Sequence, residues 1–584
     1  MRKVSLLLIV PWLLLSAACD RAPEPTASAE PTTAAPSPSQ RPPWADFRDE
    51  FIADYFEHSP DAAILLGRHE YDGRLHDLSP AAVAEEVAWL EAERATALDY
   101  TGGELAGDAA FERDYLIAAI DLMLFNLEVS GFLENNVVFY AAQVDPSIYL
   151  TLEYAPLATR MAAFATYAEN LPAFLERMQA NLRPPLARPH VEVSRGILDG
   201  LATFFADTVP GVFTDVDEAA LEARFTTALA TATDALEQSL AWLDAQELDD
   251  DYALGAERFL TMLRMSEGVD ITLAELKAAG RADLDRNLAE LREACNTYAP
   301  GDSLTACVDR TKAFKMEGGP VEGARGQLAG LKQFVIDADL VSIPGTEEAL
   351  VDEAPPYRRF NSAYINIPGP YDAGLPSTYY IAPPDPAWSE ADRLAYVPAR
   401  KDLLYISVHE VWPGHFLQFL HAKRAESPLG RLFQTYSMVE GWAHYAEQLV
   451  LDAGLDAGDA ESQIGQLSNA LLRNVRYLSA IGLHTEGMTV DESRVMFEEV
   501  GLQDPGNARQ QADRGTYDPG YLNYTLGKLM IMKLRDDWTA SRGGRDAWKE
   551  FHDTFLSYGS PPIPLIRAHM LGADYAGDTA LLPP

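Results

Sequence analysis

The chain has 584 residues, of which 47% are hydrophobic and 23% are charged, a composition typical of a folded globular protein rather than a disordered or fibrous one. Its 46 Lys and Arg stand against 88 Asp and Glu, which gives a formal net charge of −42. This charge argues against nucleic-acid binding through a broad basic face and against direct contact with anionic lipid, because both partners are themselves negative.

Residues 1–18 are typical of a secretory signal peptide. A basic pair is followed by an apolar run over residues 4–15, which is shorter than the about 20 residues of a membrane-spanning helix. The small residues directly before Cys19 resemble a bacterial lipoprotein cleavage box, with one departure at Ser16, where that box usually has Leu. We therefore expect an exported bacterial lipoprotein, anchored by a lipid on Cys19 and facing the periplasm. The alternative is an ordinary signal peptide with an incidental cysteine.

The segment after Cys19 has the composition of a linker. Residues 20–43 are mostly Pro, Ala, Ser and Thr and contain no large apolar side chain. Such a segment cannot bury a core, so residues 19–43 are predicted to be a lipidated cysteine and a flexible tether, which makes the membrane a partner only through the anchor. The remainder divides by composition into a helical region, 44–340, and a region with the candidate site, 341–584. We expect both to belong to one body.

Residues 44–340 have the pattern of a predominantly helical structure. Ala, Leu, Glu and Arg dominate, and apolar residues recur at spacings of three and four. Thr272 with Glu275 forms a capping-box pattern at the start of one apolar run. The clearest predicted helices are Ala81–Leu98, Ala219–Leu243 and Thr272–Ala294.

Two cysteines follow Cys19 in the chain. Cys295 and Cys307 stand twelve residues apart, on either side of a Pro-Gly pair. In an oxidising compartment this spacing favours a disulfide that closes a small loop. The alternative is a pair of free thiols at helix ends. Neither cysteine has a further cysteine or a histidine at close spacing, which argues against a zinc site built on cysteine.

The composition changes after residue 340, because Pro and Tyr cluster between residues 341 and 400. This density of proline excludes a long helix, and β-branched and aromatic stretches at Ala363–Ile367 and Thr378–Ile381 predict short strands of a small sheet. Further helices are predicted at Asp402–Ala422, Phe433–Leu451 and Pro519–Thr539, the last with Asp518 as its N-cap and Pro519 at its first position.

Two histidines flank a glutamate in the segment VHEVWPGHFLQ, residues 408–418. Imidazole is a favoured zinc ligand, and Glu410, directly after His409, is well placed to work on a zinc-bound water. In a regular helix His409 and His415, six residues apart, would point about 240° away from each other. They reach one metal ion only if the Pro-Gly pair between them breaks the helix. The alternative is a helix that ends before the proline, with His415 on the surface.

A second segment, EGWAHYAE at residues 440–447, adds two carboxylates and an imidazole. Glu440, His444 and Glu447 are spaced by four and three residues, so they share one face of a helix. One carboxylate is a candidate third zinc ligand, and the other is a candidate to hold a ligand imidazole by a hydrogen bond. The alternative is a solvated polar face, against which the aromatic residues flanking this face argue.

These two segments, together with DPGYLNYTLGKLMI at residues 518–531, look like a large bacterial family known as domain of unknown function 885. Its members carry H-E-x-x-P-G-H followed by E-G-W-A-x-Y-x-E, and the resemblance covers essentially the whole body, 44–575. The family is similar in turn to helical gluzincin metallopeptidases of the thimet oligopeptidase and angiotensin-converting enzyme kind. The resemblance therefore implies a mainly α, zincin-like body with a small β or extended segment before the metal-binding helices, and one Zn²⁺ ion.

In the helical gluzincins a Glu on a downstream helix completes the zinc site. By that resemblance Glu440 is the third ligand beside the two histidines, and Glu447 and His444 lie behind the ligands. Many relatives also show R-x-x-R-x-x-x-D-x-G-x-H, which corresponds to residues 473–484, but this chain has Ala480 at the position of the Asp. The departure puts any role of that Asp in doubt and leaves the zinc ligands untouched.

The implied reaction is zinc-dependent hydrolysis of amide bonds in short peptides, with Glu410 as the general base that returns the proton to the leaving amine. The oxyanion needs a donor, for which the resemblance favours Tyr524 and then Tyr521, three residues earlier on the same predicted helix face. Lys528 is expected on the solvated surface. The candidates for substrate binding are Arg514, Tyr517 and His484.

Two other functions remain open at this point. A helical periplasmic binding lipoprotein would keep the metal site as a structural or vestigial feature. Glu410 argues against this function, because a structural site does not need a base. A zinc hydrolase of a non-peptide amide or an ester would keep the site and differ in its pocket, since a fold by itself does not determine the substrate.

Overall fold

The structure, a computed structural model, describes residues 41–584 with the exception of 102, 104, 106, 360, 361, 573, 574 and 584. The expected signal peptide, Cys19 and most of the expected tether lie outside the described residues. Trp44–Pro584 forms one compact unit. The expected regions 44–340 and 341–584 are therefore parts of the same unit.

The described residues form many helices and only small sheets, which confirms the predicted mainly α fold class. The first group of helices comprises α1 (Trp44–His58), α2 (Pro60–Leu65), α3 (Pro80–Asp99), α4 (Asp108–Leu124), α5 (Phe132–Asn135), α6 (Val137–Ala141), α7 (Ser147–Thr151), α8 (Leu157–Asn181), α9 (Arg188–Asp207), α10 (Val209–Val212) and α11 (Ala219–Asp244).

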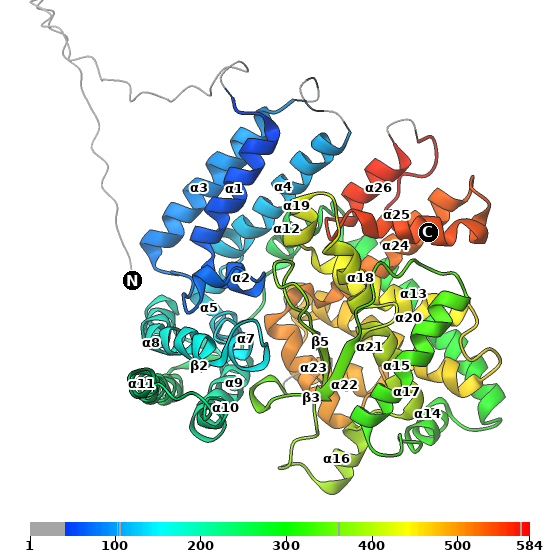
Figure 1. The fold of residues 1–584 in the computed structure, drawn as a ribbon. Helices are drawn as coiled ribbons and strands as arrows, with labels where there is room; N and C mark the ends of the chain where they lie inside the picture. Colours follow the sequence, from blue (N-terminus) through cyan, green and yellow to red (C-terminus); the bar gives the residue numbers. More distant parts are fainter. Residues whose placement is uncertain are drawn as a thin grey trace, which may run out of the picture. The chain divides into compact units, whose positions relative to one another are not determined.

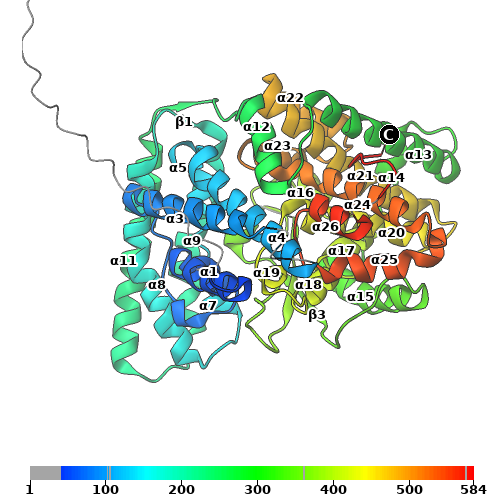
Figure 2. The ribbon, with the colours of Figure 1, turned by 90° about the horizontal axis from the view of Figure 1, so that it is seen from above.

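The second group of helices carries the candidate site. It comprises α12 (Ala256–Glu267), α13 (Leu273–Tyr298), α14 (Leu304–Lys312), α15 (Pro320–Asp337), α16 (Glu390–Tyr396), α17 (Arg400–Glu410), α18 (His415–Ala422), α19 (Pro428–Leu432), α20 (Tyr436–Asp452), α21 (Ala460–Ile481), α22 (Val490–Glu499), α23 (Pro505–Tyr517), α24 (Asn523–Thr539), α25 (Trp548–Ser557) and α26 (Ile563–Leu571). Figures 1 and 2 show α8, α9 and α11 on one side of the unit and α13, α20 and α25 on the other.

Two apolar cores correspond to the two groups of helices. The first is built mainly from α1–α11 and includes the packed rings of Phe164, Phe205 and Phe225. The second contains apolar residues of α12–α15 together with those of the site helices, among them Leu284 and Trp442. The division between the cores thus falls between α11 and α12. The change of composition near residue 340 marks the start of the small sheet, not a border between cores.

The Pro- and Tyr-rich segment forms a three-stranded sheet of β3 (Ala349–Glu353), β4 (Ala363–Asn366) and β5 (Ser377–Ile381). The strand order is β3-β5-β4, with β3 parallel and β4 antiparallel to β5. Side chains of β5 alternate between buried and half-buried, as expected when one face of a sheet covers a core. The two predicted strands match β4 and β5, whereas β3 was not predicted. A further pair of two-residue strands, β1 (Leu186–Ala187) and β2 (Leu248–Asp249), pairs in parallel.

The helices predicted in the first region correspond to α3, α11 and α13. The capping box of Thr272 and Glu275 is present at the start of α13. Cys295, near the end of α13, and Cys307, in α14, are joined in a disulfide, so the structure contains the bonded alternative. No helix in the described part of the chain combines the length and apolar character needed to cross a bilayer.

The predicted helix Pro519–Thr539 is wrong at its start. Pro519–Leu522 forms a short 3-10 turn, η5, and α24 begins only after it. Asp518 does not cap a helix with its side chain. Its carboxylate instead accepts hydrogen bonds from the hydroxyl of Tyr436 (2.8 Å) and from Nε of Arg514, four residues earlier (2.9 Å), and these partners take the place of the N–H groups of the turn.

Candidate metal centre

Two candidate ligands lie on either side of a tight turn between α17 and α18. His409 is the next-to-last residue of α17, and His415 is the first residue of α18. In the turn, the N–H of Gly414 donates to the carbonyl oxygen six residues earlier (3.0 Å) instead of continuing the helix. The indole N–H of Trp442, on α20, donates to the carbonyl oxygen of Pro413 (2.9 Å) and ties the turn to that helix. The break that the sequence required is therefore present.

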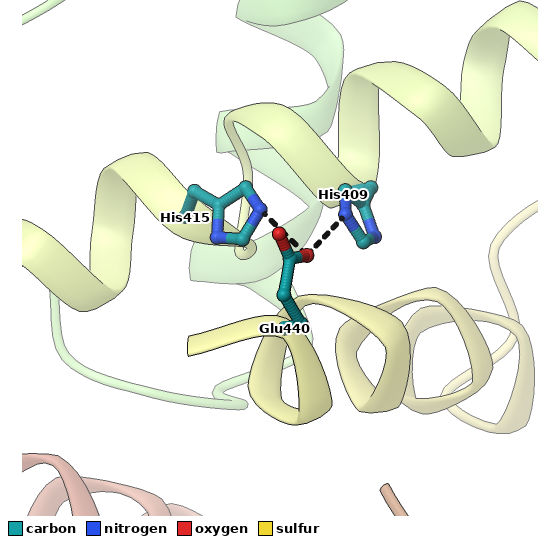
Figure 3. Close-up of side chains that lie close together, drawn as sticks. All are labelled: His409, His415 and Glu440. Atoms are coloured by element: carbon teal, nitrogen blue, oxygen red, sulfur yellow. Dashed lines mark hydrogen bonds and ion pairs between the residues drawn. The ribbon is translucent and has the colours of Figure 1, made fainter. Parts of the chain in front are cut away.

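Both imidazoles turn toward the carboxylate of Glu440 on α20 (Figure 3). Nε2 of His409 and Nε2 of His415 each lie 3.2 Å from Oε2 of Glu440, and one ligand atom of each residue falls within 4.8 Å of the others. Burial alone would raise the pKa of Glu440, but the two imidazoles hold it well below its ordinary value. The carboxylate is therefore ionised and able to act as a metal ligand.

Glu447, two turns further along α20, holds His409 from the other side of its ring. Oε1 of Glu447 lies 2.8 Å from Nδ1 of His409 and 3.0 Å from Nη2 of Arg473. Burial alone would raise the pKa of Glu447, but Arg473 and then His409 hold it far below its ordinary range. Because an ionised carboxylate can only accept, Nδ1 of His409 carries a proton, which leaves Nε2, the nitrogen beside Glu440, as the one available to a metal ion.

A close crossing of α20 and α24 sets the position of the third ligand. A Cβ added at Gly441 would lie 2.4 Å from Cα of Gly527, so neither helix has room for a side chain at the crossing. This contact brings Glu440 of α20 and Tyr524 of α24 to the same place. The ring of Tyr524 stacks on the ring of His409, with centroids 6.0 Å apart.

A cavity of about 540 Å³, within the range of small-molecule sites, opens in front of the candidate ligands. Strand β4 and the rings of Tyr524, His409 and His415 line it. Burial raises the pKa of Tyr524, with Arg514 opposing the rise, so the phenol keeps its proton at neutral pH. Nη2 of Arg514 donates to the Tyr524 oxygen (3.3 Å), which leaves the Tyr524 proton available for another acceptor.

Glu410 is buried beside the histidines and lines the same cavity. Burial raises the pKa of its carboxyl group to about 7, with His415 opposing the rise and Glu440 adding to it. A carboxyl group that titrates near neutral pH can both take up and release a proton. This is the property that the sequence-based hypothesis requires of Glu410.

Two of the predicted site residues lie elsewhere. Tyr521 belongs to η5, which packs against α21, and its buried hydroxyl donates to Oγ of Ser479 (2.9 Å). It does not line the cavity, because the chain breaks from the regular helix on which the shared face with Tyr524 was predicted. His484 is also buried, with Nε2 hydrogen-bonded to the carbonyl oxygen of Gly515 (2.7 Å), and lines a separate cavity. The structure therefore brings neither Tyr521 nor His484 to the cavity of the candidate ligands, in contrast to the prediction.

Other predicted residues lie near the site without lining its cavity. Arg514 and Tyr517 line a second cavity, which adjoins the first. His444 is fully buried behind the ligands, with Nδ1 3.6 Å from Oε2 of Glu447. Lys528, expected on the surface, is fully buried and pairs with Asp283 (3.1 Å), so that prediction is wrong.

Two arginines of α21, which the sequence did not mark as site residues, also reach the site. Arg473 contacts Glu447, as described above, and the guanidinium of Arg476 lies 4.6 Å from the ring centroid of Tyr524. Both line the cavity of the candidate site. The available signal was their spacing of three, which puts both charges on one face of a helix whose other charged residue is Glu461, because buried charges require partners.

A known bacterial family covers most of the chain. The family described as "Bacterial protein of unknown function (DUF885)" matches residues 60–570. The chain belongs to this family. The matched range includes the turn between α17 and α18, α20 and α24, so all three candidate ligands lie inside the family region. No curated protein matches the chain.

Two solved structures share the fold of this family member. A candidate lipoprotein of unknown function from Shewanella oneidensis is 22% identical, with 91% of this chain and 100% of that chain covered and a TM-score of 0.74. A candidate lipoprotein from Colwellia psychrerythraea is 15% identical, with 90% of this chain and 98% of that chain covered and a TM-score of 0.75. At these identities the matches establish the fold alone.

Proposed function

We propose that the protein is a zinc-dependent hydrolase that cleaves amide bonds of short peptides, with a site similar to that of the helical gluzincin peptidases. The observation that carries the proposal is the convergence of His409, His415 and Glu440 beside buried Glu410 in one cavity. A structural or vestigial metal site does not need a carboxyl group such as that of Glu410 next to its ligands. Its presence therefore favours hydrolysis over a binding lipoprotein.

The donor set fits zinc. Two imidazole nitrogens and a carboxylate oxygen are ligands that zinc takes at about 2.0–2.2 Å in catalytic sites, which keep a fourth position open. The hydrogen bond from Nδ1 of His409 to Glu447 fixes the tautomer and the ring orientation that a ligand requires. Zinc, when bound there, would polarise a water molecule and the carbonyl group of the substrate.

The residues of the chain supply the proton transfers. Glu410 is placed to accept a proton from water and to deliver it to the leaving amine. The hydroxyl of Tyr524 is placed to donate to the carbonyl oxygen as negative charge develops on it. Arg476, over the ring of Tyr524, and Arg514, at its oxygen, hold this side chain in position.

Zinc content and peptide cleavage, measured together, test the proposal. We expect about one zinc per chain by mass spectrometry and cleavage of a peptide library by the wild type, and loss of both in His409→Ala, because a catalytic site has only three protein ligands. The matched control is His421→Ala on α18, whose imidazole bonds the carbonyl oxygen of Ser342 and does not line the cavity. A wild-type protein that binds no zinc and cleaves no peptide would contradict the proposal.

Replacement of Tyr524 by Phe tests its role as donor. We expect kcat to fall by about 10²-fold to 10³-fold with zinc content unchanged, because removal of one oxyanion donor has an effect of that size. Tyr521→Phe is the matched control, since it deletes an equally buried hydroxyl that bonds only Ser479 among the described residues. Equal activity of Tyr524→Phe and the control would remove Tyr524 from the proposed mechanism.

We also propose that the protein is an exported lipoprotein, anchored through Cys19 and facing the periplasm. The cleavage-box resemblance supports this localisation, and so do the two proteins of the same fold, which are described as candidate lipoproteins. A palmitate analogue should label the wild type in cells and should not label Cys19→Ser. Label that persists in the variant would contradict anchoring at this position.

A further inference from the structure

A second cavity, of about 650 Å³, adjoins the candidate metal centre. Gln434, Val439 and Glu440 line both cavities, so the first turn of α20 and the residues before it form a shared wall. Glu440 thus contacts the ligand histidines on one side and borders the second cavity as well. A substrate held at the metal centre would have this cavity next to its reacting bond.

The wall of the second cavity is mainly apolar. Helices of the first group, the π turn η2 (Phe125–Val129) and α12 contribute to it, so both apolar cores of the unit meet there. The larger apolar side chains that line it include Leu122, Phe125, Phe132, Val138, Phe139 and Met262. Such a surface favours an apolar occupant, because each buried CH₂ group contributes about 0.8 kcal/mol.

The charged groups that border the second cavity already have hydrogen-bond or ion-pair partners. Both carboxylate oxygens of Glu267 accept hydrogen bonds, one from Ser437 and the other from Nδ2 of Asn523. Arg514 is paired with Asp518 (2.9 Å). An anionic occupant would therefore lose its hydration without gaining a free cation from these groups, which disfavours it.

We propose that the second cavity binds a bulky apolar side chain of the peptide substrate, adjacent to the bond that is cleaved. This inference rests on the proposed function and specifies its substrate class as peptides with Phe, Leu or a similar residue next to the cleaved bond. The cavity is large enough for an aromatic side chain, and its shared wall at Glu440 places that side chain beside the metal centre.

A series of peptides that differ in one residue next to the cleaved bond tests the proposal. With wild type we expect kcat/KM to be at least about tenfold higher for Phe and Leu than for Ala, Asp or Lys. Val138→Phe narrows the cavity and should remove the advantage of Phe over Ala while zinc content is kept. Val495→Phe makes the same change at an exposed position on α22 and should keep the preference. Phe139→Ala, which opens the cavity, is a second variant for the case that Val138→Phe does not fold.

Binding of N-acetyl-phenylalanine amide, measured by calorimetry, separates this proposal from the proposed function. We expect wild type to bind it more tightly than N-acetyl-alanine amide, and Val138→Phe or Phe139→Ala to lose this difference. If no peptide is cleaved but the difference in binding is present and cavity-dependent, the cavity assignment stands and the hydrolase proposal fails. If peptides are cleaved with no preference for apolar residues, or if the preference is unchanged in both cavity variants, the cavity assignment is overturned.

Discussion

Replacement of Glu410 by Gln is expected to reduce kcat for peptide cleavage by about 10²-fold to 10⁴-fold, the usual contribution of a positioned acid or base. Gln has nearly the same shape as Glu and can still contact its neighbours, but it cannot accept and return a proton. Because Glu410 is not among the three converging ligands, the variant should keep its zinc. The measurement is single-turnover cleavage of a library-derived peptide, with zinc quantified in the same sample.

The control for this variant is Glu112→Gln. Glu112 is also a buried glutamate, but it lies on α4 and bonds Trp44 and Arg48, away from the cavity. This control should cleave peptide at the wild-type rate, although it loses some stability. Cleavage by Glu410→Gln at the rate of the control would show that another group is the base. Loss of zinc from Glu410→Gln would show instead that Glu410 holds the metal.

The residues that converge on the site were predictable because their signals are local. His409, Glu410 and His415 stand within seven residues, and Glu440 and Glu447 are seven apart on one helix. Helical periodicity places the two carboxylates on one face, and a Pro-Gly pair allows the turn that joins the histidines. The resemblance to a family then selected Glu440 rather than Glu447 as the proposed ligand. In the structure Glu440 lies beside both histidines, whereas Glu447 contacts His409 from the other side of its ring.

The errors arose where distant segments determine the position of a side chain. Tyr521 and Tyr524 were placed on one face of a regular helix, but the 3-10 turn before α24 directs the hydroxyl of Tyr521 to α21. Lys528 was assigned to the surface because lysine is rarely buried, yet Asp283, 245 residues earlier, provides a buried partner. A single sequence contains no local signal for such a pair.

The side chains and the helix contact that hold the site residues in position were not all predicted, because they too depend on distant segments. Arg473 and Arg476 contact groups on α20 and α24, and these helices become neighbours of α21 only in the folded unit. The close crossing at Gly441 and Gly527 depends likewise on two helices that are far apart in the chain. Glycine in a helix is ordinarily unfavourable by about 1 kcal/mol, so each of these two positions could have been read as a sign of close packing.

Replacement of Gly414 by Ala is expected to abolish metal binding and activity together. A Cβ at this position would lie 1.8 Å from the carbonyl oxygen of His409 and 2.4 Å from that of Val408, both backbone atoms that cannot move aside as a side chain can. The turn must therefore open, and the hydrogen bond from Gly414 to Val408 is lost with it. His415, the next residue, then leaves the position in which its Nε2 faces Glu440. We expect zinc affinity to fall at least about 100-fold, more than for loss of a group that only supports a ligand.

The control for this variant is Gly330→Ala on α15, where an added Cβ has nothing within 4 Å. Ala at an open helical position should raise stability by up to about 1 kcal/mol and leave zinc content and cleavage unchanged. Comparison of zinc content and cleavage between the two variants separates the effect of opening the turn from the general effect of an added methyl group. Full zinc occupancy and normal cleavage in Gly414→Ala would mean that the two histidines do not depend on this turn to reach one ion, and the proposed metal centre would lose its geometric basis.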